Sequence, residues 1–361
     1  MNSDLTLAAM SGGVDSSVTA ALLLERGHKI VGVTMSVWEP PENVERHSGA
    51  CCSTEDTDDA RRVAEKLGIP HYSLNVKNEF KEGVIDNFVR EYLSGRTPNP
   101  CVKCNQILKF DHLFQKGERF GARYVATGHY ARIGSFMGSS VIMRGIDRHK
   151  DQSYFLFSTP PDKLGRILFP LGELSKEETR KLAHKYGLNV ADKKESQEIC
   201  FIPDDNYAKF IEQTSRSTTH CEGDIVRSSG EKLGRHQGFM RFTIGQRKGL
   251  GIASSAPLYV IDIVPERNQV VVGEREEVFS SRLLATDMNW FVDPHEIGDL
   301  ELTAKIRSRS EDSPAEITIK GKNSVSITFA EPQLAITPGQ GVAIYHGQFL
   351  LGGGWIERGL N

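Results

Sequence analysis

The chain has 361 residues, which is enough for two or three domains, each with its own hydrophobic core. With 39% hydrophobic residues, 25% charged residues and no long apolar run, the composition indicates a soluble enzyme and excludes a membrane-embedded one. The N-terminus lacks the basic and then apolar pattern of an export signal. We therefore expect a cytoplasmic location.

The net charge of −3 conceals an uneven distribution along the chain. Residues 1–100 carry 10 Lys and Arg against 15 Asp and Glu, and residues 201–361 carry 17 against 21. Residues 101–200 reverse the balance, with 17 basic side chains against 11 acidic ones. A basic middle segment can follow a phosphate backbone, but lysine-rich solvated helix faces produce the same pattern. Charge alone therefore leaves a nucleic-acid partner open.

In the first 130 residues, strand-like apolar runs alternate with helical patterns. The strand-like runs are 5–10, 28–38, 71–76 and 123–131, and the helical patterns are 18–27, 56–68 and 80–95. Repeated strand and helix units predict a doubly wound parallel sheet that binds its ligand at the carboxyl ends of the strands. The segment SGGVDSS (11–17) follows the first strand, and Met35 and Gly128 lie at the ends of two later ones.

The second half of the chain has a different pattern. Residues 174–188 predict a helix that is capped by Ser175 and Glu178 and ends at Gly187. From about Gly223 onward, short β-branched runs alternate with glycine turns, which predicts all-β structure. We expect an α/β catalytic domain over residues 1–205, with part of a central module inserted around 160–190. A small, mixed, β-rich central domain over 206–278 and a C-terminal β-barrel over 279–361 would follow.

The segment SGGVDSS has the glycines of a phosphate-binding loop but not the lysine. A Walker loop requires GxxxxGK followed by Ser or Thr, and the chain contains no such run. Backbone N–H groups at a helix N-terminus still bind an anionic oxygen, and Asp15 is a candidate Mg²⁺ ligand. Without a lysine for a transferred γ-phosphoryl group, the loop suits a pyrophosphate leaving group. This predicts adenylation by ATP, with a plain glycine turn as the alternative.

The cysteines are too few for a disulfide scaffold in a chain of this length. They are Cys51, Cys52, Cys101, Cys104, Cys200 and Cys221. Cys101, Cys104 and Cys200 can hold an iron–sulfur cluster with one open iron. A zinc site is the weaker interpretation, because it needs a fourth cysteine from among the other three. We expect those three to be structural or incidental.

The segment SGGVDS resembles the signature of the PP-loop ATP pyrophosphatases, which adenylate an oxygen atom and release pyrophosphate. Seven further segments, in order along the chain, are similar to segments of the tRNA-specific 2-thiouridylase family. They are NPCVKCNQILKF (99–110), TGHYAR (127–132), KDQSYFL (150–156), SQEICFI (196–202), FTIGQRKGLGI (242–252), PGQ (338–340) and LGGGWI (351–356).

This resemblance implies ATP-dependent conversion of the wobble uridine (U34) of tRNA to 2-thiouridine, with release of AMP and pyrophosphate. AMP is a good leaving group for the C2 oxygen, and a cysteine persulfide supplies the sulfur. The family's cysteine pair falls on Cys104 as the nucleophile and Cys200 as the persulfide carrier. A disulfide between them would be a catalytic state. The sulfur donor would be a cysteine desulfurase or a sulfur-relay protein, and Lys103, Lys193 and Lys194 are candidates for lowering thiol pKa values.

The resemblance also implies which residues bind ATP and tRNA. The ATP loop would comprise Ala9, Met10, Ser11, Gly12, Gly13, Val14, Asp15 and Ser16, with Met35 and Gly128 at the adenine and ribose. Asn99, Pro100 and Cys101 would meet the target base of the anticodon stem-loop, after that base is turned out. Further tRNA contacts would be His129, Lys150, Asp151, Gln152, Arg307, Ser308 and Gln340.

Three alternatives remain open. Cys101 stands where the family often has Asp, so an iron–sulfur route through Cys101, Cys104 and Cys200 is kept beside the persulfide route. A PP-loop ligase for a small molecule is disfavoured by the motif-embedded cysteines and the basic middle segment. A sulfur-carrier or cluster-scaffold protein without ATP turnover is disfavoured by the intact SGGVDS.

Overall fold

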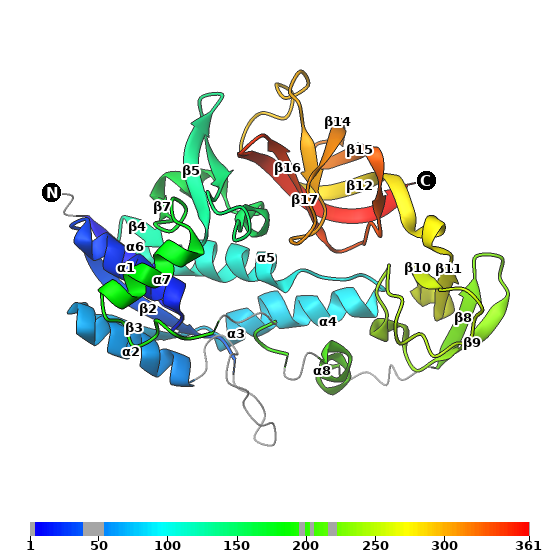
Figure 1. The fold of residues 1–361 in the computed structure, drawn as a ribbon, viewed down its shortest axis with the longest axis horizontal. Coiled ribbons are helices and arrows are strands. Elements are labelled where there is room, and N and C mark those ends of the chain that lie inside the picture. Colours follow the sequence, from blue (N-terminus) through cyan, green and yellow to red (C-terminus); the bar gives the residue numbers. More distant parts are fainter. Residues whose placement is uncertain (1–3, 39–53, 195–198, 203–205, 216–221, 361) are drawn as a thin grey trace.

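The computed structural model describes residues 4–38, 54–194, 199–202, 206–215 and 222–360 (Figure 1). These residues form a parallel sheet with helices, a small mixed sheet and a closed barrel, which confirms the expected fold class. None of the helices in this part of the chain has both the length and the apolar character needed to cross a membrane.

The N-terminal unit contains a parallel sheet in the strand order β3-β2-β1-β4-β7. Its strands are β1 (Leu5–Ala9), β2 (Lys29–Ser36), β3 (His71–Asn75), β4 (Tyr124–Ala126) and β7 (Ile167–Leu168). Successive β1 side chains enter different cores: Leu7 packs in one cluster with Phe114, and Ala8 packs in another with Val18. Because neighbouring strand residues face opposite sides, the sheet is covered on both faces, as a doubly wound fold requires.

The helices of the N-terminal unit are α1 (Val14–Glu25), α2 (Thr54–Leu67), α3 (Lys77–Phe80), α4 (Asp86–Leu93), α5 (Pro100–Cys104), α6 (Leu113–Arg119) and α7 (Lys176–Lys185). Most of them match the periodic patterns in the sequence. Two π-helical stretches, Lys81–Ile85 and Asn105–His112, join α3 to α4 and α5 to α6. Helix α7 begins with the expected capping box of Ser175 and Glu178.

Residues 160–190 belong to the parallel-sheet unit, which differs from the expected insertion of a central module there. The strand β7 in this stretch pairs in parallel with β4, through Val125↔Ile167 and Ala126↔Leu168. Helix α7 packs directly against α1. The stretch therefore supplies the edge strand and one covering helix of the sheet.

The central unit is a small mixed sheet in the order β10-β11-β8-β9, preceded by helix α8 (Tyr207–Thr214). Its strands are β8 (Gly223–Arg227), β9 (Lys232–His236), β10 (Tyr259–Val264) and β11 (Gln269–Gly273). Buried Ile225, Val260 and Val270 lie in its separate core. Short 3₁₀ turns elsewhere cover 153–156, 161–166, 239–241, 265–267 and 275–278.

The C-terminal unit is a closed six-stranded barrel, because its first strand also pairs with its last. The strands are β12 (Phe279–Trp290), β13 (Thr303–Lys305), β14 (Ser313–Gly321), β15 (Ser324–Leu334), β16 (Gly341–His346) and β17 (Phe349–Leu360). A hairpin of β5 (Ala131–Phe136) and β6 (Ser139–Arg144) joins the barrel through Leu350↔Ile142 and Phe349↔Met143. The N-terminal unit thus extends the sheet of the barrel (Figure 1).

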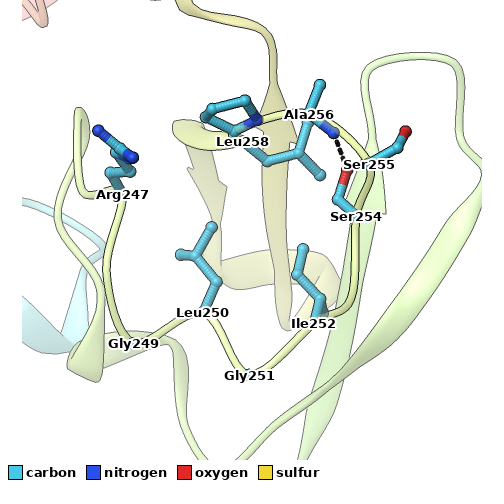
Figure 2. Close-up of a pocket in the computed structure, with 10 residues that line it drawn as sticks. Arg247, Gly249, Leu250, Gly251, Ile252, Ser254, Ser255, Ala256 and Leu258 are labelled. Carbon is cyan, nitrogen blue, oxygen red and sulfur yellow. Dashed lines mark hydrogen bonds between the residues drawn. The ribbon is translucent and has the colours of Figure 1, made fainter.

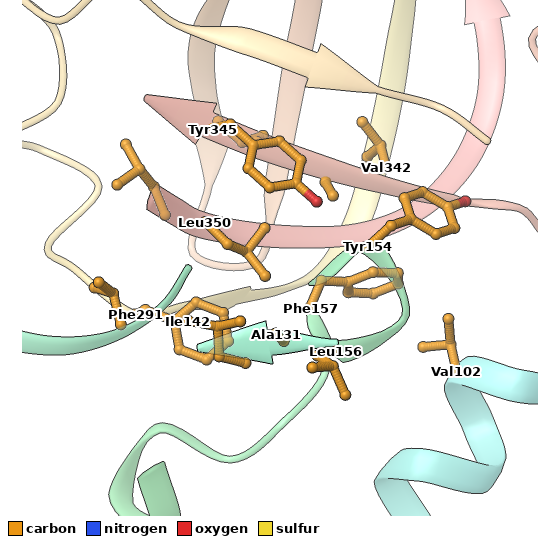
Figure 3. Close-up of a cluster of buried hydrophobic side chains, with 14 of the residues drawn as sticks. Val102, Ala131, Ile142, Tyr154, Leu156, Phe157, Phe291, Val342, Tyr345 and Leu350 are labelled. Atoms are coloured by element: carbon orange, nitrogen blue, oxygen red, sulfur yellow. The ribbon is translucent and has the colours of Figure 1, made fainter. Parts of the chain in front are cut away.

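The barrel and the N-terminal unit share one continuous core. Figure 3 shows Tyr154 and Phe157 between Val102 of α5 and Val342 of β16. The Tyr154 hydroxyl donates to the Gly341 carbonyl at 2.9 Å, and the Asn289 amide donates to the carbonyls of Phe157 and Thr159 at 2.7 and 2.9 Å. The polar groups buried between the two units are therefore hydrogen-bonded to each other, and the two units pack as one body.

A glycine run in β17 permits this close approach. A Cβ on Gly353 would lie 2.6 Å from the Cβ of Phe157 and 2.5 Å from the Val342 carbonyl oxygen. A Cβ on Gly352 would similarly meet the Trp290 ring at 2.5 Å. The LGGGWI segment therefore allows an aromatic residue of the N-terminal unit to pack directly on the barrel backbone.

We predict that Gly353→Ala lowers the free energy of unfolding by about 1–3 kcal/mol, because the added methyl overpacks the contact with Phe157. Tryptophan fluorescence during urea unfolding measures this, since Trp290 and Trp355 both lie in the barrel. Gly298→Ala is the control, because a Cβ at that position meets nothing within 4 Å. Equal unfolding midpoints for the two variants would contradict the prediction.

Candidate active site

The loop 11–17 lies between β1 and α1, at the carboxyl edge of the parallel sheet. Gly12 has a φ of +72°, and a Cβ there would overlap the Asp56 carbonyl oxygen of α2. Ser16 Oγ accepts from the Ser11 N–H and donates to the Gly13 carbonyl, both at 3.1 Å. No described side chain caps the N-terminus of α1 at Gly13. The N–H groups of an uncapped helix N-terminus can donate to an anion, which is the role predicted for this loop.

Other predicted nucleotide-binding residues border this loop. A Cβ on Gly128 would lie 3.0 Å from the backbone of Asp15 and Ser16, so only glycine lets the end of β4 approach α1 this closely. The Met10 N–H donates to the Val33 carbonyl at 2.8 Å, which ties the loop to β2. Met35 lies near the end of β2, on the same edge of the sheet.

A lysine that the sequence analysis did not identify lies at the loop. Lys176, the first residue of α7, places its ammonium 2.7 and 2.9 Å from the two carboxylate oxygens of Asp15. The Tyr130 hydroxyl also donates to Asp15, at 2.9 Å. The capping pattern in the sequence predicted where α7 begins. It could not predict that Lys176 contacts Asp15, because the two residues are 161 positions apart in the chain.

A second lysine lies on the other side of the loop. Lys193 donates to the Gly12 carbonyl at 3.1 Å and to Asp56 and Asp59 at 2.7 Å each. Burial lowers the pKa of Lys193, but the hydrogen bonds and charges of Asp56 and Asp59 outweigh burial and raise that pKa overall. The Lys193 ammonium, a candidate for lowering a thiol pKa, therefore pairs with the carboxylates beside the loop.

Cys104 and Cys200 lie at the same hydrophobic cluster, although 96 residues separate them. Cys104 is the last residue of α5, and Cys200 precedes Phe201, which is buried between Phe80 and Phe88. Met35 of β2 packs against this cluster as well. The fold thus brings both candidate catalytic thiols and a candidate adenine contact to one region.

Cys101 differs from the other two thiols in its surroundings. It is exposed, whereas Cys104 and Cys200 are half-buried, and all three are free of disulfides. Among the residues that the structure describes, no three His, Cys, Asp or Glu side chains are grouped as metal ligands. The three thiols therefore do not form a cluster-binding set in this arrangement. Cys51, Cys52, Cys221 and the SQE part of SQEICFI lie outside the described residues.

The Lys103 ammonium lies 4.7 Å above the Trp355 ring of the barrel. Burial lowers the pKa of Lys103, although Asp287 and Glu91 partly oppose this. This cation–π contact joins α5 to the barrel. We therefore assign Lys103 to the contact between the two units.

The segment for the target base, residues 99–101, begins helix α5. The buried Asn99 side chain accepts from the Val102 N–H at 3.4 Å and so caps the helix, and Pro100 occupies its first position. Gln340, a predicted tRNA contact, donates its amide to the Thr97 and Pro98 carbonyls at 3.0 and 3.1 Å. Gln340 and the base segment are thus direct neighbours.

His129 follows β4 and is buried. Its Nδ1 lies 2.7 Å from Thr127 Oγ1, and its Nε2 lies 3.5 Å from the Lys109 ammonium. Burial, and secondarily the Lys109 charge, lower the pKa of His129 well below its usual value. The ring is therefore neutral at physiological pH.

Three of the remaining predicted tRNA contacts, Asp151, Gln152 and Arg307, make internal hydrogen bonds. The Asp151 carboxylate is 4% exposed, pairs with Arg144 at 3.4 Å and accepts from the Gly145 N–H at 3.1 Å. Gln152 accepts from the Tyr130 N–H at 3.0 Å, and Arg307 donates to the Ala335 carbonyl at 2.6 Å. The half-buried Lys150 and Ser308 lie beside them in the chain. These side chains support the junction between hairpin, barrel and sheet.

The QRKGLG segment lies in the central unit, apart from the two cysteines. It borders a cavity of about 430 Å³ that Arg247, Leu250, Ile252 and Leu258 line (Figure 2). Gln246 holds the corner of this loop by donating to the Lys248 carbonyl at 3.0 Å. The Arg247 and Lys248 side chains are exposed, which is compatible with the phosphate contacts considered for this segment.

Three family models match successive parts of the chain. The tRNA methyl transferase HUP domain matches residues 5–204, the tRNA methyl transferase PRC-barrel domain matches 208–274, and the aminomethyltransferase beta-barrel domain matches 280–356. The first match alone covers more than half of the chain.

Curated relatives match over nearly the whole length. The tRNA-specific 2-thiouridylase MnmA of Carboxydothermus hydrogenoformans is 52% identical over 98% of this chain and 98% of its own. The proteins of the same name from Geobacter metallireducens and Heliobacterium modesticaldum are 49% and 48% identical, over 98% and 99% of this chain and 97% and 94% of theirs. The chain, with its parallel sheet, central sheet and barrel, belongs to the tRNA-specific 2-thiouridylase family.

Proposed function

We propose that this protein uses ATP to adenylate the C2 oxygen of the wobble uridine (U34) of tRNA and then inserts sulfur at C2. The products are 2-thiouridine, AMP and pyrophosphate. The observation that carries the proposal is the shared hydrophobic cluster of Met35, Cys104 and Cys200, beside the carboxyl edge that holds the SGGVDSS loop. Membership of the 2-thiouridylase family supports tRNA as the substrate.

In the adenylation step, the C2 oxygen attacks the α-phosphorus of ATP. A bond forms between that oxygen and the α-phosphorus, and the bond from the α-phosphorus to pyrophosphate breaks. The uncapped N-terminus of α1 and the Lys176 ammonium would stabilise the charge that develops on the leaving pyrophosphate. The lysine that the loop lacks in sequence would thus come from α7.

Asp15 would be the protein ligand of Mg²⁺, in place of the Lys176 ammonium that contacts both carboxylate oxygens in this structure. Mg²⁺ is usually held by one or two carboxylates together with substrate phosphates. The Asp15 side chain is 33% exposed and lies 2.7 Å from the Lys176 ammonium. When bound, the ion would neutralise phosphate charge. Lys176 and Tyr130 hold the carboxylate in place.

In the sulfur step, the terminal sulfur of a Cys200 persulfide attacks C2 of the adenylated base. A C2–S bond forms, the C2–O bond breaks, and AMP leaves. The Cys104 thiolate then attacks the Cys200 sulfur and breaks its S–S bond. This releases 2-thiouridine and leaves a Cys104–Cys200 disulfide, which a cellular thiol reduces. A cysteine desulfurase or a sulfur-relay protein would reload Cys200.

The iron–sulfur route finds less support in the fold. Cys101 is exposed, while Cys104 and Cys200 are half-buried, and the described residues contain no grouped metal ligands. The residues therefore do not fit a cluster in this arrangement, and the proposed steps do not use one.

The first test is single-turnover thiolation of a tRNA substrate by Cys→Ser variants under anaerobic conditions. We expect Cys104→Ser and Cys200→Ser to lose 2-thiouridine formation by a factor of about 10³ or more, because each removes a reacting sulfur. Both variants should still release pyrophosphate. Cys101→Ser separates the two routes, and under the persulfide route it should still form 2-thiouridine.

Iron content and visible absorption, recorded in the same samples, separate the alternatives. Loss of activity and iron together in all three variants would replace the persulfide route with the cluster route. Pyrophosphate release that needs no tRNA would instead indicate a small-molecule ligase.

A second prediction concerns the lysine at the loop. Lys176→Met should slow tRNA-dependent pyrophosphate release by about 10²-fold, because it removes the ammonium that lies at the loop and would stabilise the leaving group. Lys181→Met is the control, because Lys181 lies on the same helix but pairs at the surface with Glu177, at 2.6 Å. The rate is measured with saturating ATP and tRNA, and equal rates for the two variants would rule out the role given to Lys176.

A further inference from the structure

The PGQ turn of the barrel binds the chain just before the base-contact segment. Gln340 Nε2 donates to the Thr97 and Pro98 carbonyls at 3.0 and 3.1 Å, and the Thr97 N–H donates to the Pro338 carbonyl at 2.8 Å. Gly339 lies between them with a φ of +86°, and a Cβ there would lie 3.0 Å from the Thr97 carbonyl oxygen. Each residue of the turn therefore contacts the segment of Thr97 and Pro98.

The sequence of the segment explains why it needs an external partner. Pro98 and Pro100 have no N–H groups, and residues 97–99 belong to neither a helix nor a strand. The Thr97 and Pro98 carbonyls therefore require donors from elsewhere in the chain. A primary amide has two N–H hydrogens, and Gln340 has one carbonyl for each of them.

The same edge of the barrel also holds the two flanks of α5. On one side, Arg96 donates to the Ile356 carbonyl at 3.2 Å and to Glu357 at 3.0 Å. On the other side, the Lys103 ammonium lies 4.7 Å above the Trp355 ring. Ile356 in turn donates to the Gln340 carbonyl at 2.8 Å. Residues 338–340 and 355–357 thus form one surface, which we call the barrel clamp.

We propose that the barrel clamp positions Cys104. Gln340 and Trp355 would act as positioning residues that fix the place and tilt of α5, so that its last residue meets the Cys200 sulfur. This role goes beyond a tRNA contact for Gln340, because both of its amide hydrogens are directed at the protein backbone. The functional consequence rests on the proposed role of Cys104 as a nucleophile, but the positioning itself does not.

The first readout is the reactivity of Cys104 in tRNA-free protein. Wild type, Gln340→Ala and the control Gln333→Ala are treated with iodoacetamide, and the alkylation of each cysteine is followed by mass spectrometry. Gln333 is a matched control because its amide donates to the Glu331 carbonyl, within the barrel, at 2.8 Å. We expect Gln340→Ala to change the Cys104 rate several-fold while the Cys200 rate stays constant. Gln333→Ala should change neither rate.

The second readout separates turnover from binding. Gln340→Ala should lower the rate constant of thiolation by about 10- to 100-fold, because small displacements of a reacting group have effects of this size, and tRNA affinity should stay constant. Gln340→Glu keeps the packing and replaces the two donors by acceptors, so it should act in the same direction. Trp355→Leu should do so as well, through the loss of the Lys103 contact. Melting curves show whether each variant is folded.

Two results would overturn the inference. One is a Cys104 alkylation rate equal to that of the wild type in both Gln340→Ala and Gln340→Glu, when both variants are folded. The other is loss of tRNA affinity with unchanged Cys104 reactivity, which would make Gln340 a tRNA contact. If the wild-type protein forms no 2-thiouridine but the clamp variants still alter Cys104 reactivity, the positioning holds and the proposed function fails.

Discussion

The edge-to-face packing of Phe201 is the contact on which the candidate site depends. Phe201 follows Cys200 directly and is 1% exposed, with its ring centroid 5.5 Å from that of Phe80, 5.3 Å from Phe88 and 5.3 Å from Phe210. Burial of a phenylalanine contributes roughly 1.5–3 kcal/mol, and each favourable aromatic pair adds to it. This packing keeps Cys200 beside the helices that precede Cys104, although the two thiols are distant in sequence.

The charges around the SGGVDSS loop follow from its missing lysine. A loop that binds phosphate through backbone N–H groups alone leaves much of the anionic charge unbalanced. In this fold Lys176 and Lys193 come from later parts of the chain and reach the loop through Asp15 and the Gly12 carbonyl. Each ammonium has carboxylate partners in the free protein, which offsets the cost of placing it in a half-buried site. The two ammonium groups nearest the loop are therefore supplied by tertiary structure, and Asp15, Asp56 and Asp59 are their carboxylate partners.

Much of the fold could be predicted from the sequence, because local patterns determine it. Alternating strands and helices gave the parallel sheet, and Ser175 with Glu178 gave the start of α7. The ammonium positions of Lys103, Lys176 and Lys193 could not be predicted in this way, because a side chain several ångströms long has many partners within reach. Adjacency in sequence suggested that Lys103 and Lys193 act on the thiols, whereas their tertiary partners are Trp355 and Asp56 with Asp59.

The family segments themselves show why a motif does not distinguish substrate contact from architecture. Asp151 of KDQSYFL holds the turn before Ser153 and pairs with the buried Arg144. Gly353 of LGGGWI admits Phe157, and Gln340 of PGQ holds Thr97 and Pro98. All three therefore act where the barrel meets the N-terminal unit. Displacing a reacting group lowers the rate of an enzyme as strongly as losing a substrate contact does. The residues of a junction that fixes a thiol are therefore as restricted in identity as those of a binding site.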